Sequence, residues 1–195
     1  LARIAAASME IPEFRDMVGT VKYTIPSGND GSTRVLFNHN RLLRLYGDAV
    51  GIKTGFTKKN GDDRAPMAST TKVMTALVVL EQANLDETVS IPPEACGIEG
   101  SSIYMKPGER MTVRDLLYAL LLQSANDAAA ALAITVSGSI EAFARQMNER
   151  ASALGLVNTH FVNPHGLDDP EHFTSAKDLA RIAAASMEIP EFRDM

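Results

Sequence analysis

The sequence predicts an α+β fold that is mainly helical and contains a few antiparallel strands. Apolar and polar residues alternate at 18–25, a turn cluster follows at 27–31, and extended character resumes at 34–37, so we predict a β-hairpin. Apolar residues recur every three or four positions in the longer stretches of the second half, which is the spacing of one helix face. We expect helices at residues 69–83, 113–122, 127–136 and 140–154.

Each remaining element rests on a local pattern. Residues 49–56 are typical of a further strand, although two glycines interrupt it. The helix at 127–136 consists of small residues and is apolar nearly all round, so we predict that it is buried. Residues 91–101, which include Pro92 and Pro93, and residues 158–172, which are rich in Asn, Pro, His and Asp, indicate loops.

Length and composition exclude several classes of protein. With 195 residues, 45% of them apolar and 22% charged, the chain suits one compact domain with a real core. The net charge of −5 argues against a nucleic-acid partner bound by neutralising phosphates. The single cysteine, Cys96, leaves no intrachain disulfide. The apolar run at 116–122 is far shorter than the roughly 18 residues that span a bilayer. Because Leu1 opens a stretch typical of mid-helix, we expect neither a signal peptide nor a membrane anchor in this chain.

A perfect repeat links the two ends of the chain. Residues 1–17, LARIAAASMEIPEFRDM, recur identically as residues 179–195. The pattern predicts a helix that Pro190 closes, and Ser175 with Asp178 three residues later forms a variant capping box before the second copy. The repeat is either a by-product of how the chain arose or the mark of a circular permutation or helix exchange. Helix exchange would give a homodimer, since one element supplied twice invites swapping.

The tetrapeptide Ser69-Thr70-Thr71-Lys72 places a hydroxyl and an amine on the same helix face, one turn apart. A serine is a weak nucleophile without a base, and a neutral lysine in a dry site can serve as that base. The position at a helix N-terminus also favours developing negative charge. Taken alone, the tetrapeptide is more often a capping serine followed by a solvated lysine.

Two further short motifs carry polar groups into buried or extended positions. Ser124-Ala125-Asn126 falls between two apolar helices, where we expect a buried turn whose side chains must find partners. Lys53-Thr54-Gly55 ends the strand predicted at 49–56. There a lysine and a hydroxyl can hold a carboxylate, and the glycine lets a substrate approach the backbone. Each motif alone would more often be an ordinary cap or strand end.

The combination S-x-x-K, S-x-N and K-T-G is the signature shared by class A β-lactamases and penicillin-binding proteins. Residues 64–77, RAPMASTTKVMTAL, closely resemble the nucleophile segment of the low-molecular-mass D-alanyl-D-alanine carboxypeptidases, peptidase family S11. Further segments that resemble this family are residues 38–43, 51–57, 106–109, 116–129 and 163–167. The resemblance implies a β-lactamase/transpeptidase-like fold, with residues 1–195 as a single domain.

The resemblance also implies an activity and catalytic roles. The chain would be a serine D-Ala-D-Ala carboxypeptidase that acts on peptidoglycan stem peptides through an acyl-enzyme and is acylated by β-lactams. Ser69 would attack the penultimate D-Ala carbonyl, and Lys72 would take its proton. Ser124 would relay a proton to the leaving amine, and Asn126 would hydrogen-bond the substrate amide. The location implied is extracytoplasmic, in the cell envelope.

The same resemblance assigns substrate binding to the K-T-G segment. Lys53 and Thr54 would bind the terminal carboxylate. The backbone N–H groups of Ser69 and of Phe56, the residue after Gly55, would form the oxyanion hole. No metal and no organic cofactor is implied.

The chain departs from the family pattern in the order of its motifs. K-T-G precedes S-x-x-K, which is a cyclic rotation of the family order and agrees with the repeated ends. The join at 58–61 is too short for the strands that the family has on either side, so we expect a permuted chain with a reduced antiparallel sheet. The alternatives are a serine β-lactamase, for which no glutamate stands in a recognisable context, and an inactive penicillin-binding-like scaffold.

A zinc site is a weaker alternative. The loop at 158–172 concentrates imidazoles and carboxylates, but it lacks an H-E-x-x-H pattern and helical spacing. We therefore expect no metal site from His160, His165, Asp168, Asp169 and His172.

Overall fold

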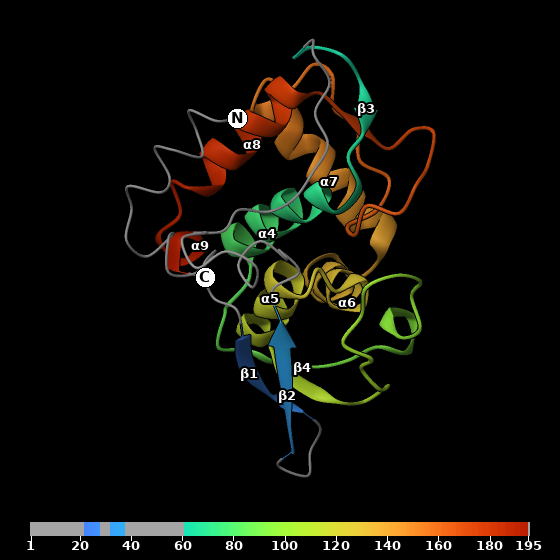
Figure 1. Cartoon of the computed structure of the whole chain (residues 1–195), viewed down its shortest axis with the longest axis vertical. Coiled ribbons are helices and arrows are strands. Elements are labelled where there is room, and N and C mark those ends of the chain that lie inside the picture. The colour runs from blue at the N-terminus through green and yellow to red at the C-terminus, as the bar shows by residue number, and fades with distance from the viewer. Residues whose placement is uncertain (1–21, 28–31, 38–60, 195) are drawn as a thin grey trace.

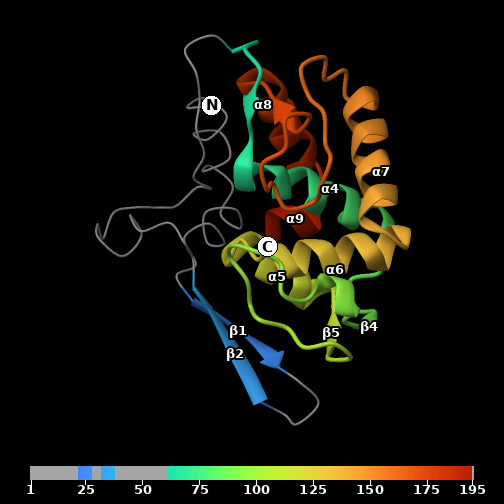
Figure 2. The same cartoon turned by 90° about the vertical axis from the view of Figure 1, so that its right-hand side faces the viewer.

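Helix α4 (Thr71–Gln82) lies at the centre of the computed structural model, which describes residues 22–27, 32–37 and 61–194. Figures 1 and 2 show α5 and α6 below α4, α8 above it and α7 beside it, and α4 contacts all four of these helices and α9. Their bounds are α5 Val113–Leu122, α6 Asn126–Ser137, α7 Ile140–Ala153, α8 Ala176–Ser186 and α9 Pro190–Asp194.

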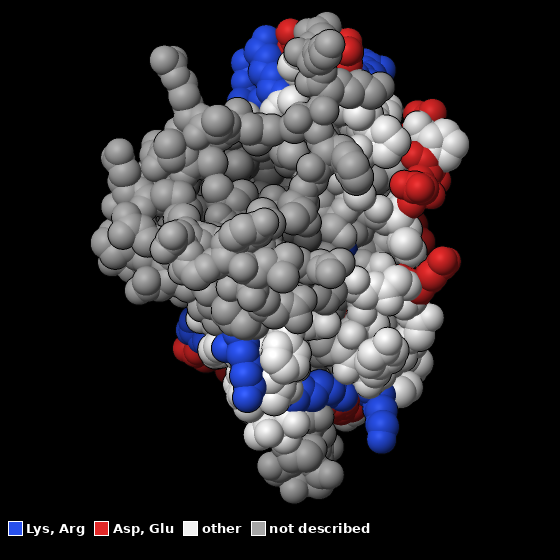
Figure 3. Space-filling model, in the orientation of Figure 1, with Lys and Arg blue, Asp and Glu red and all other residues white. Residues whose placement is uncertain are grey.

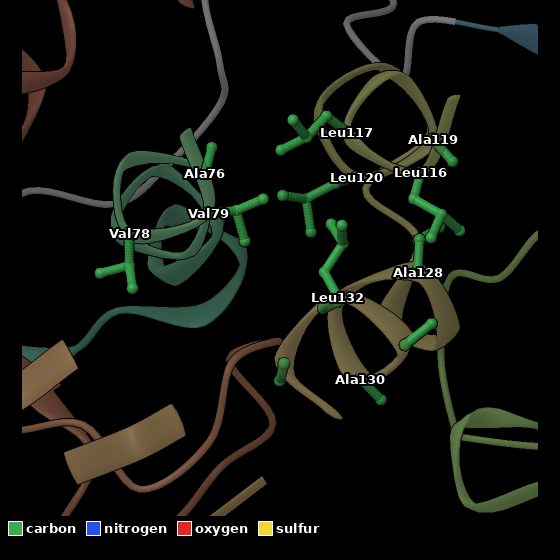
Figure 4. Close-up of a cluster of buried hydrophobic side chains, with 14 of the residues drawn as sticks. Ala76, Val78, Val79, Leu116, Leu117, Ala119, Leu120, Ala128, Ala130 and Leu132 are labelled. Atoms are coloured by element: carbon green, nitrogen blue, oxygen red, sulfur yellow. The ribbon is translucent and has the colours of Figure 1, made fainter. Parts of the chain in front are cut away.

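The core forms where α4, α5 and α6 meet. Val79 of α4, Leu120 of α5 and Leu132 of α6 point toward one another and are fully buried (Figure 4). Burying a side chain of this size stabilises the fold by about 1.5–3 kcal/mol. Residues 128–133 of α6 are all completely buried, which confirms the prediction made from its all-round apolar pattern.

The helix boundaries follow local capping chemistry. The hydroxyl of Thr112 accepts the N–H of Asp115 at 3.1 Å before α5, and Ser139 accepts the N–H of Ala142 at 3.1 Å before α7. Gly138 ends α6 with a φ of +79°, a conformation that glycine adopts without strain. The helices predicted at 113–122, 127–136 and 140–154 are confirmed to within a residue at each end. The helix predicted at 69–83 begins as a 3-10 turn, η1 (Ala68–Thr70), and continues as α4.

The predicted hairpin is confirmed for the described residues, whereas residues 18–21 of its predicted first strand lie outside them. Strand β1 (Lys22–Ser27) pairs antiparallel with β2 (Ser32–Phe37), in the register that sets Thr24 opposite Val35. The hairpin packs on α5 through Tyr23, whose ring stacks on Tyr118 with centroids 4.1 Å apart.

Two short sheets were not predicted. Strand β3 (Ala65–Pro66) pairs with β6 (Phe173–Thr174), and β4 (Thr88–Ser90) pairs with β5 (Arg110–Thr112). Strands of two or three residues are too short to show a period of two in the sequence. The β3–β6 pair places the segment before Ser69 beside the end of the loop predicted at 158–172, and η2 (Pro93–Ala95) is a 3-10 turn in the other predicted loop.

The second copy of the repeat forms α8 and α9, and two details of its prediction are wrong. Pro190 does not close α8, which ends at Ser186; it opens α9, because a proline in the first turn needs no N–H partner. Ser175 is the N-cap as predicted and accepts the N–H of Asp178 at 3.1 Å. The Asp178 carboxylate, however, accepts the N–H of Asn158 at 2.7 Å, so it ties α8 to the loop instead of completing the box.

Several predictions fall outside the described residues: the first copy of the repeat at 1–17 and the strand at 49–56. That residues 1–195 form a single domain stays a prediction. In the described ranges, no individual helix is long and apolar enough to cross a membrane. The helices α6 and α7 meet these two criteria only when they are taken together, and the pair is bent by 83°. Figure 3 shows Asp and Glu along the right-hand edge of one face, and Lys and Arg at its upper and lower ends.

Candidate active site

The proposed nucleophile and base lie side by side at the start of α4. Ser69, in η1, is half-buried, and Lys72 follows one turn later with only 1% of its surface exposed. The Lys72 Nζ and the Ser69 Oγ are 3.3 Å apart, within hydrogen-bonding distance. The predicted placement of the two groups on one helix face is therefore observed, and the lysine is buried instead of solvated.

Two oxygen atoms hold the amine of Lys72. Its Nζ donates to Oδ1 of Asn126 at 2.7 Å and to the backbone carbonyl of His165 at 2.6 Å. A neutral amine has two N–H donors and one lone pair. These two oxygens hold the Nζ atom beside the Ser69 hydroxyl, a position from which the neutral form of an amine can accept a proton.

Asn126 is fixed by the loop before α5 as well as by Lys72. Its Nδ2 donates to the carbonyl of Glu99 at 2.6 Å, and its backbone N–H donates to the carbonyl of Ser101 at 2.7 Å. The intervening Gly100 has a φ of +93°, and a Cβ there would lie 2.8 Å from Asn126 Nδ2. A side chain at residue 100 would thus push the amide away from Lys72.

Ser124 occupies the same polar turn, directly before α6. It is 3% exposed and has a φ of +57°, a value uncommon for a residue other than glycine. Within the part of the chain that the structure describes, its Oγ has no hydrogen-bond partner. The expectation that the buried side chains of this turn find partners thus holds for Asn126 and not for Ser124. A buried hydroxyl without a partner costs free energy, which a polar substrate group would recover.

The loop segment 163–167 is stabilised by internal hydrogen bonds and is anchored to α4 by another. The Asn163 side chain accepts the N–H of Gly166 at 2.7 Å and donates to the carbonyl of Leu167 at 2.9 Å. The carbonyl of Pro164 accepts the hydroxyl of Thr75 at 2.6 Å. This anchoring presents the His165 carbonyl to Lys72, a role that sequence reasoning missed although the segment had been singled out.

Two buried imidazoles flank the site and are neutral at neutral pH. Burial, followed by the charge of Lys72, lowers the pKa of His165 to about 4. Burial also lowers the pKa of His172 to about 4, although nearby Asp169 opposes the shift. Neither imidazole therefore adds positive charge beside Lys72. Among residues 22–27, 32–37 and 61–194, no group of three His, Cys, Asp or Glu is placed to hold a metal ion.

The structure brings together Ser69, Lys72 and Asn126, with Ser124 on the same turn as Asn126. The other predicted site residues, Lys53, Thr54, Gly55 and Phe56, lie outside the described residues, and their roles stay predictions.

Comparison with known proteins identifies the family. The profile of the D-alanyl-D-alanine carboxypeptidase family, peptidase family S11, matches residues 57–193. The D-alanyl-D-alanine carboxypeptidase DacF of Bacillus subtilis is 41% identical over 130 residues, which are 64% of this chain and 33% of the relative. DacC of Escherichia coli is 39% identical over 144 residues, or 68% of this chain and 36% of the relative.

A solved structure supports the same assignment. Penicillin-binding protein 6B of Escherichia coli superposes with a TM-score of 0.66 at 36% identity, covering 68% of this chain and 46% of that one. The predicted penicillin-binding, transpeptidase-like fold class is thereby confirmed. The chain spans about a third of the length of the curated relatives above. The profile match begins after Lys53-Thr54-Gly55, so the permuted order of the motifs stays a prediction. With its profile matched over residues 57–193 and the Ser69–Lys72 pair inside that match, the chain belongs to the D-alanyl-D-alanine carboxypeptidase family, peptidase family S11.

Proposed function

We propose that this chain is a serine D-Ala-D-Ala carboxypeptidase that removes the terminal D-alanine from peptidoglycan stem peptides. The observation that carries the proposal is the buried Lys72 amine, 3.3 Å from Ser69 Oγ and held by Asn126 and the His165 carbonyl. An exposed lysine would be protonated and unable to act as a base at neutral pH. Burial favours the neutral form of an amine, which is the form that activation of serine requires.

Acylation follows from these positions. Ser69 Oγ attacks the carbonyl of the penultimate D-Ala while its proton passes to Lys72 Nζ. The proton then moves through the hydroxyl of Ser124 to the amine of the leaving D-Ala, which needs it to depart. The second N–H of the Asn126 amide is directed to the substrate amide. Water, deprotonated by Lys72, hydrolyses the acyl-enzyme and restores the serine.

The remaining contacts belong to the end of the strand predicted at 49–56. Lys53 and Thr54 would bind the terminal carboxylate of the peptide, and Gly55 would let it approach the backbone. The N–H groups of Phe56 and Ser69 would stabilise the oxyanion. The proposed reaction uses no metal and no organic cofactor. β-Lactams would acylate Ser69 because they mimic the D-Ala-D-Ala unit.

The names of the relatives, D-alanyl-D-alanine carboxypeptidases, support this substrate. Because peptidoglycan lies outside the cytoplasm, the proposed substrate places the chain in the cell envelope.

A fluorescent penicillin tests the proposal directly. The purified chain should form a stable covalent adduct, and Ser69→Ala should abolish it while leaving the fold intact. Ser152→Ala removes an exposed hydroxyl on α7 and is the matched control. Release of D-alanine from a peptide ending in D-Ala-D-Ala completes the assay. Rapid turnover of the label would identify a β-lactamase, and absence of labelling an inactive scaffold; either result contradicts the proposal.

We also propose that the chain forms a helix-exchanged homodimer. The residues that bury α8 against the core, among them Leu179, Ile182 and Ser186, belong to the repeat and recur in the same order in residues 1–17. Both copies therefore carry the apolar face that fits against α4. The copy that is not seated there can occupy the same place in a second molecule.

A further inference from the structure

The backbone directly before the nucleophile is held in a strained conformation. Ala68 has a φ of +45°, in the left-handed region that costs a residue with a Cβ about 1–2 kcal/mol. Strain of this kind persists only where the surroundings impose it. Three contacts meet at the Ala68 carbonyl: it accepts the backbone N–H of Thr71 and the hydroxyl of Thr71, the latter at 2.7 Å, and Gly166 lies so close that a Cβ would be 2.0 Å away.

His172 belongs to a series of hydrogen bonds in which each donor and each acceptor is determined by its neighbours. Its Nδ1 accepts the N–H of Val162 at 3.0 Å, so Nδ1 carries a lone pair. A neutral imidazole then bears its proton on Nε2, which lies 2.8 Å from the Thr71 hydroxyl and donates to it. Thr71 uses its own proton for the Ala68 carbonyl. The chain therefore runs from Val162 through His172 and Thr71 to Ala68.

The series of hydrogen bonds ends on the Ala68 carbonyl. This carbonyl belongs to the same peptide group as the N–H of Ser69. A hydrogen bond received by a peptide carbonyl polarises the whole group and makes its N–H a stronger donor. Donors aimed in advance at developing negative charge contribute strongly to acyl transfer. We propose that His172 and Thr71 are positioning residues that orient and polarise the Ala68–Ser69 peptide, so that the Ser69 N–H is a preset donor to the oxyanion. This inference rests on the proposed function, in which that N–H belongs to the oxyanion hole.

The contacts of His172 differ from those that merely anchor the loop. The loop is already joined to α4 by Thr75, through Pro164, and by Lys72, through His165. The His172–Thr71 link, by contrast, is continued by the Thr71 hydroxyl to the nucleophile's own peptide. The titratable groups that act on His172 are Asp168, Asp169 and His160, and His172 in turn acts on His165.

Paired substitutions separate polarisation from simple anchoring. Thr71→Ser keeps the hydroxyl and should acylate with penicillin within about threefold of the wild type. Thr71→Val removes the hydroxyl and should lower the acylation rate constant roughly 10–100-fold, less than the 10²–10³-fold cost of losing a direct oxyanion donor. The affinity before acylation should not change, because the effect belongs to the transition state. His172→Gln, which offers an N–H near the position of Nε2, should retain more activity than His172→Leu.

A control and a spectroscopic readout address a purely structural role. Thr159→Val breaks the hydroxyl contact with Asp178, 3.0 Å long, and should lower the melting temperature without changing the acylation rate constant. Nitrogen-15 NMR should show His172 as the Nε2–H tautomer. The Ser69 amide proton should shift in Thr71→Val and not in Thr71→Ser.

The outcomes separate this inference from the proposed function. If penicillin does not acylate the wild-type protein, the proposed function is contradicted. The shift of the Ser69 amide proton then decides whether the hydrogen bonds through His172 and Thr71 polarise this peptide. If the wild type is acylated and Thr71→Val is acylated equally fast, or if His172 carries its proton on Nδ1, the inference is overturned.

Discussion

Replacement of Gly166 by alanine is the sharpest test of how closely the loop and the nucleophile turn are fitted. The added Cβ would lie 2.0 Å from the oxygen and 2.5 Å from the carbon of the Ala68 carbonyl. Non-bonded atoms of this kind settle at roughly 3.5 Å, so one backbone must move by more than about 1 Å. Both of these atoms belong to the main chain, so no side-chain rotation can relieve their clash, and the Cβ would also lie 2.9 Å from Thr71 Oγ1.

The expected cost has two parts. Gly166 has a φ of +91°, which alone disfavours alanine by about 1–2 kcal/mol. Overpacking adds typically 1–3 kcal/mol, so the free energy of unfolding should fall by roughly 2–5 kcal/mol. Movement of either backbone also alters the Ser69–Lys72 geometry. A misplacement of about 1 Å can lower the rate about 10²-fold, and we expect acylation by penicillin to fall by that order.

Gly155 provides the matched control. Its φ is +68°, and a Cβ there would meet nothing within 4 Å, so Gly155→Ala carries the backbone cost without the clash. Chemical denaturation and penicillin acylation of both variants measure the difference. If Gly166→Ala loses no more stability than Gly155→Ala and acylates at the wild-type rate, the close approach of Gly166 to the nucleophile turn is refuted.

Three further predictions concern the base, the histidines and the repeat. Lys72→Arg should lower the rate of penicillin acylation at least about 10²-fold, because arginine does not give up its proton. Lys177→Arg, on the surface, is the control and should have no effect. An active Lys72→Arg enzyme would show that the lysine is not the base. The pKa values of His165 and His172, about 4 instead of 6.5, mean that the unfolded chain takes up protons first as pH falls. The free energy of unfolding should therefore decrease from about pH 6.5 to about pH 4, by roughly 1–3 kcal/mol per histidine, and level off below; denaturation of the two His→Gln variants should show a flatter profile. Sedimentation at rising protein concentration should reveal monomer and exchanged dimer, and deletion of residues 179–195 should favour the monomer; strictly monomeric behaviour of both chains would contradict helix exchange.

The sequence predicted those features that leave a local pattern. The helix at 113–122 was placed correctly because its apolar residues recur at helical spacing up to the polar turn that follows it. The three-residue spacing of Ser69 and Lys72 was enough to bring their side chains together, since one helical turn separates them. Strands β3 to β6 left no pattern, because two or three residues cannot show an alternation.

The groups that hydrogen-bond to the site residues could not be predicted from local sequence patterns, for a different physical reason. The His165 carbonyl that holds Lys72 is a backbone atom, which every residue has, so nothing in the sequence marks it. His172 and Thr71 are 101 positions apart, and only the fold brings them into contact. Pro190 was misjudged because proline both ends helices and starts them, and the residues that decide between the two lie further along the chain.

The docking of the hairpin has a consequence for the order of folding. Arg34 forms a bidentate ion pair with Glu109 at 2.5 and 2.9 Å, and the N–H of Phe37 donates to Gln123 at 3.0 Å. These contacts join residues 75 and 86 positions apart, whereas α5, α6 and α7 pack on neighbours close in the chain. Closing a long loop costs entropy before any contact compensates for it, so the helical layer should assemble first and the hairpin should dock afterwards. Pulsed hydrogen exchange would show this as protection of the α5 and α6 amides before those of β1 and β2; simultaneous protection would contradict it. Gln123 immediately precedes Ser124, so docking of the hairpin would add a late contact next to the turn that carries Ser124 and Asn126.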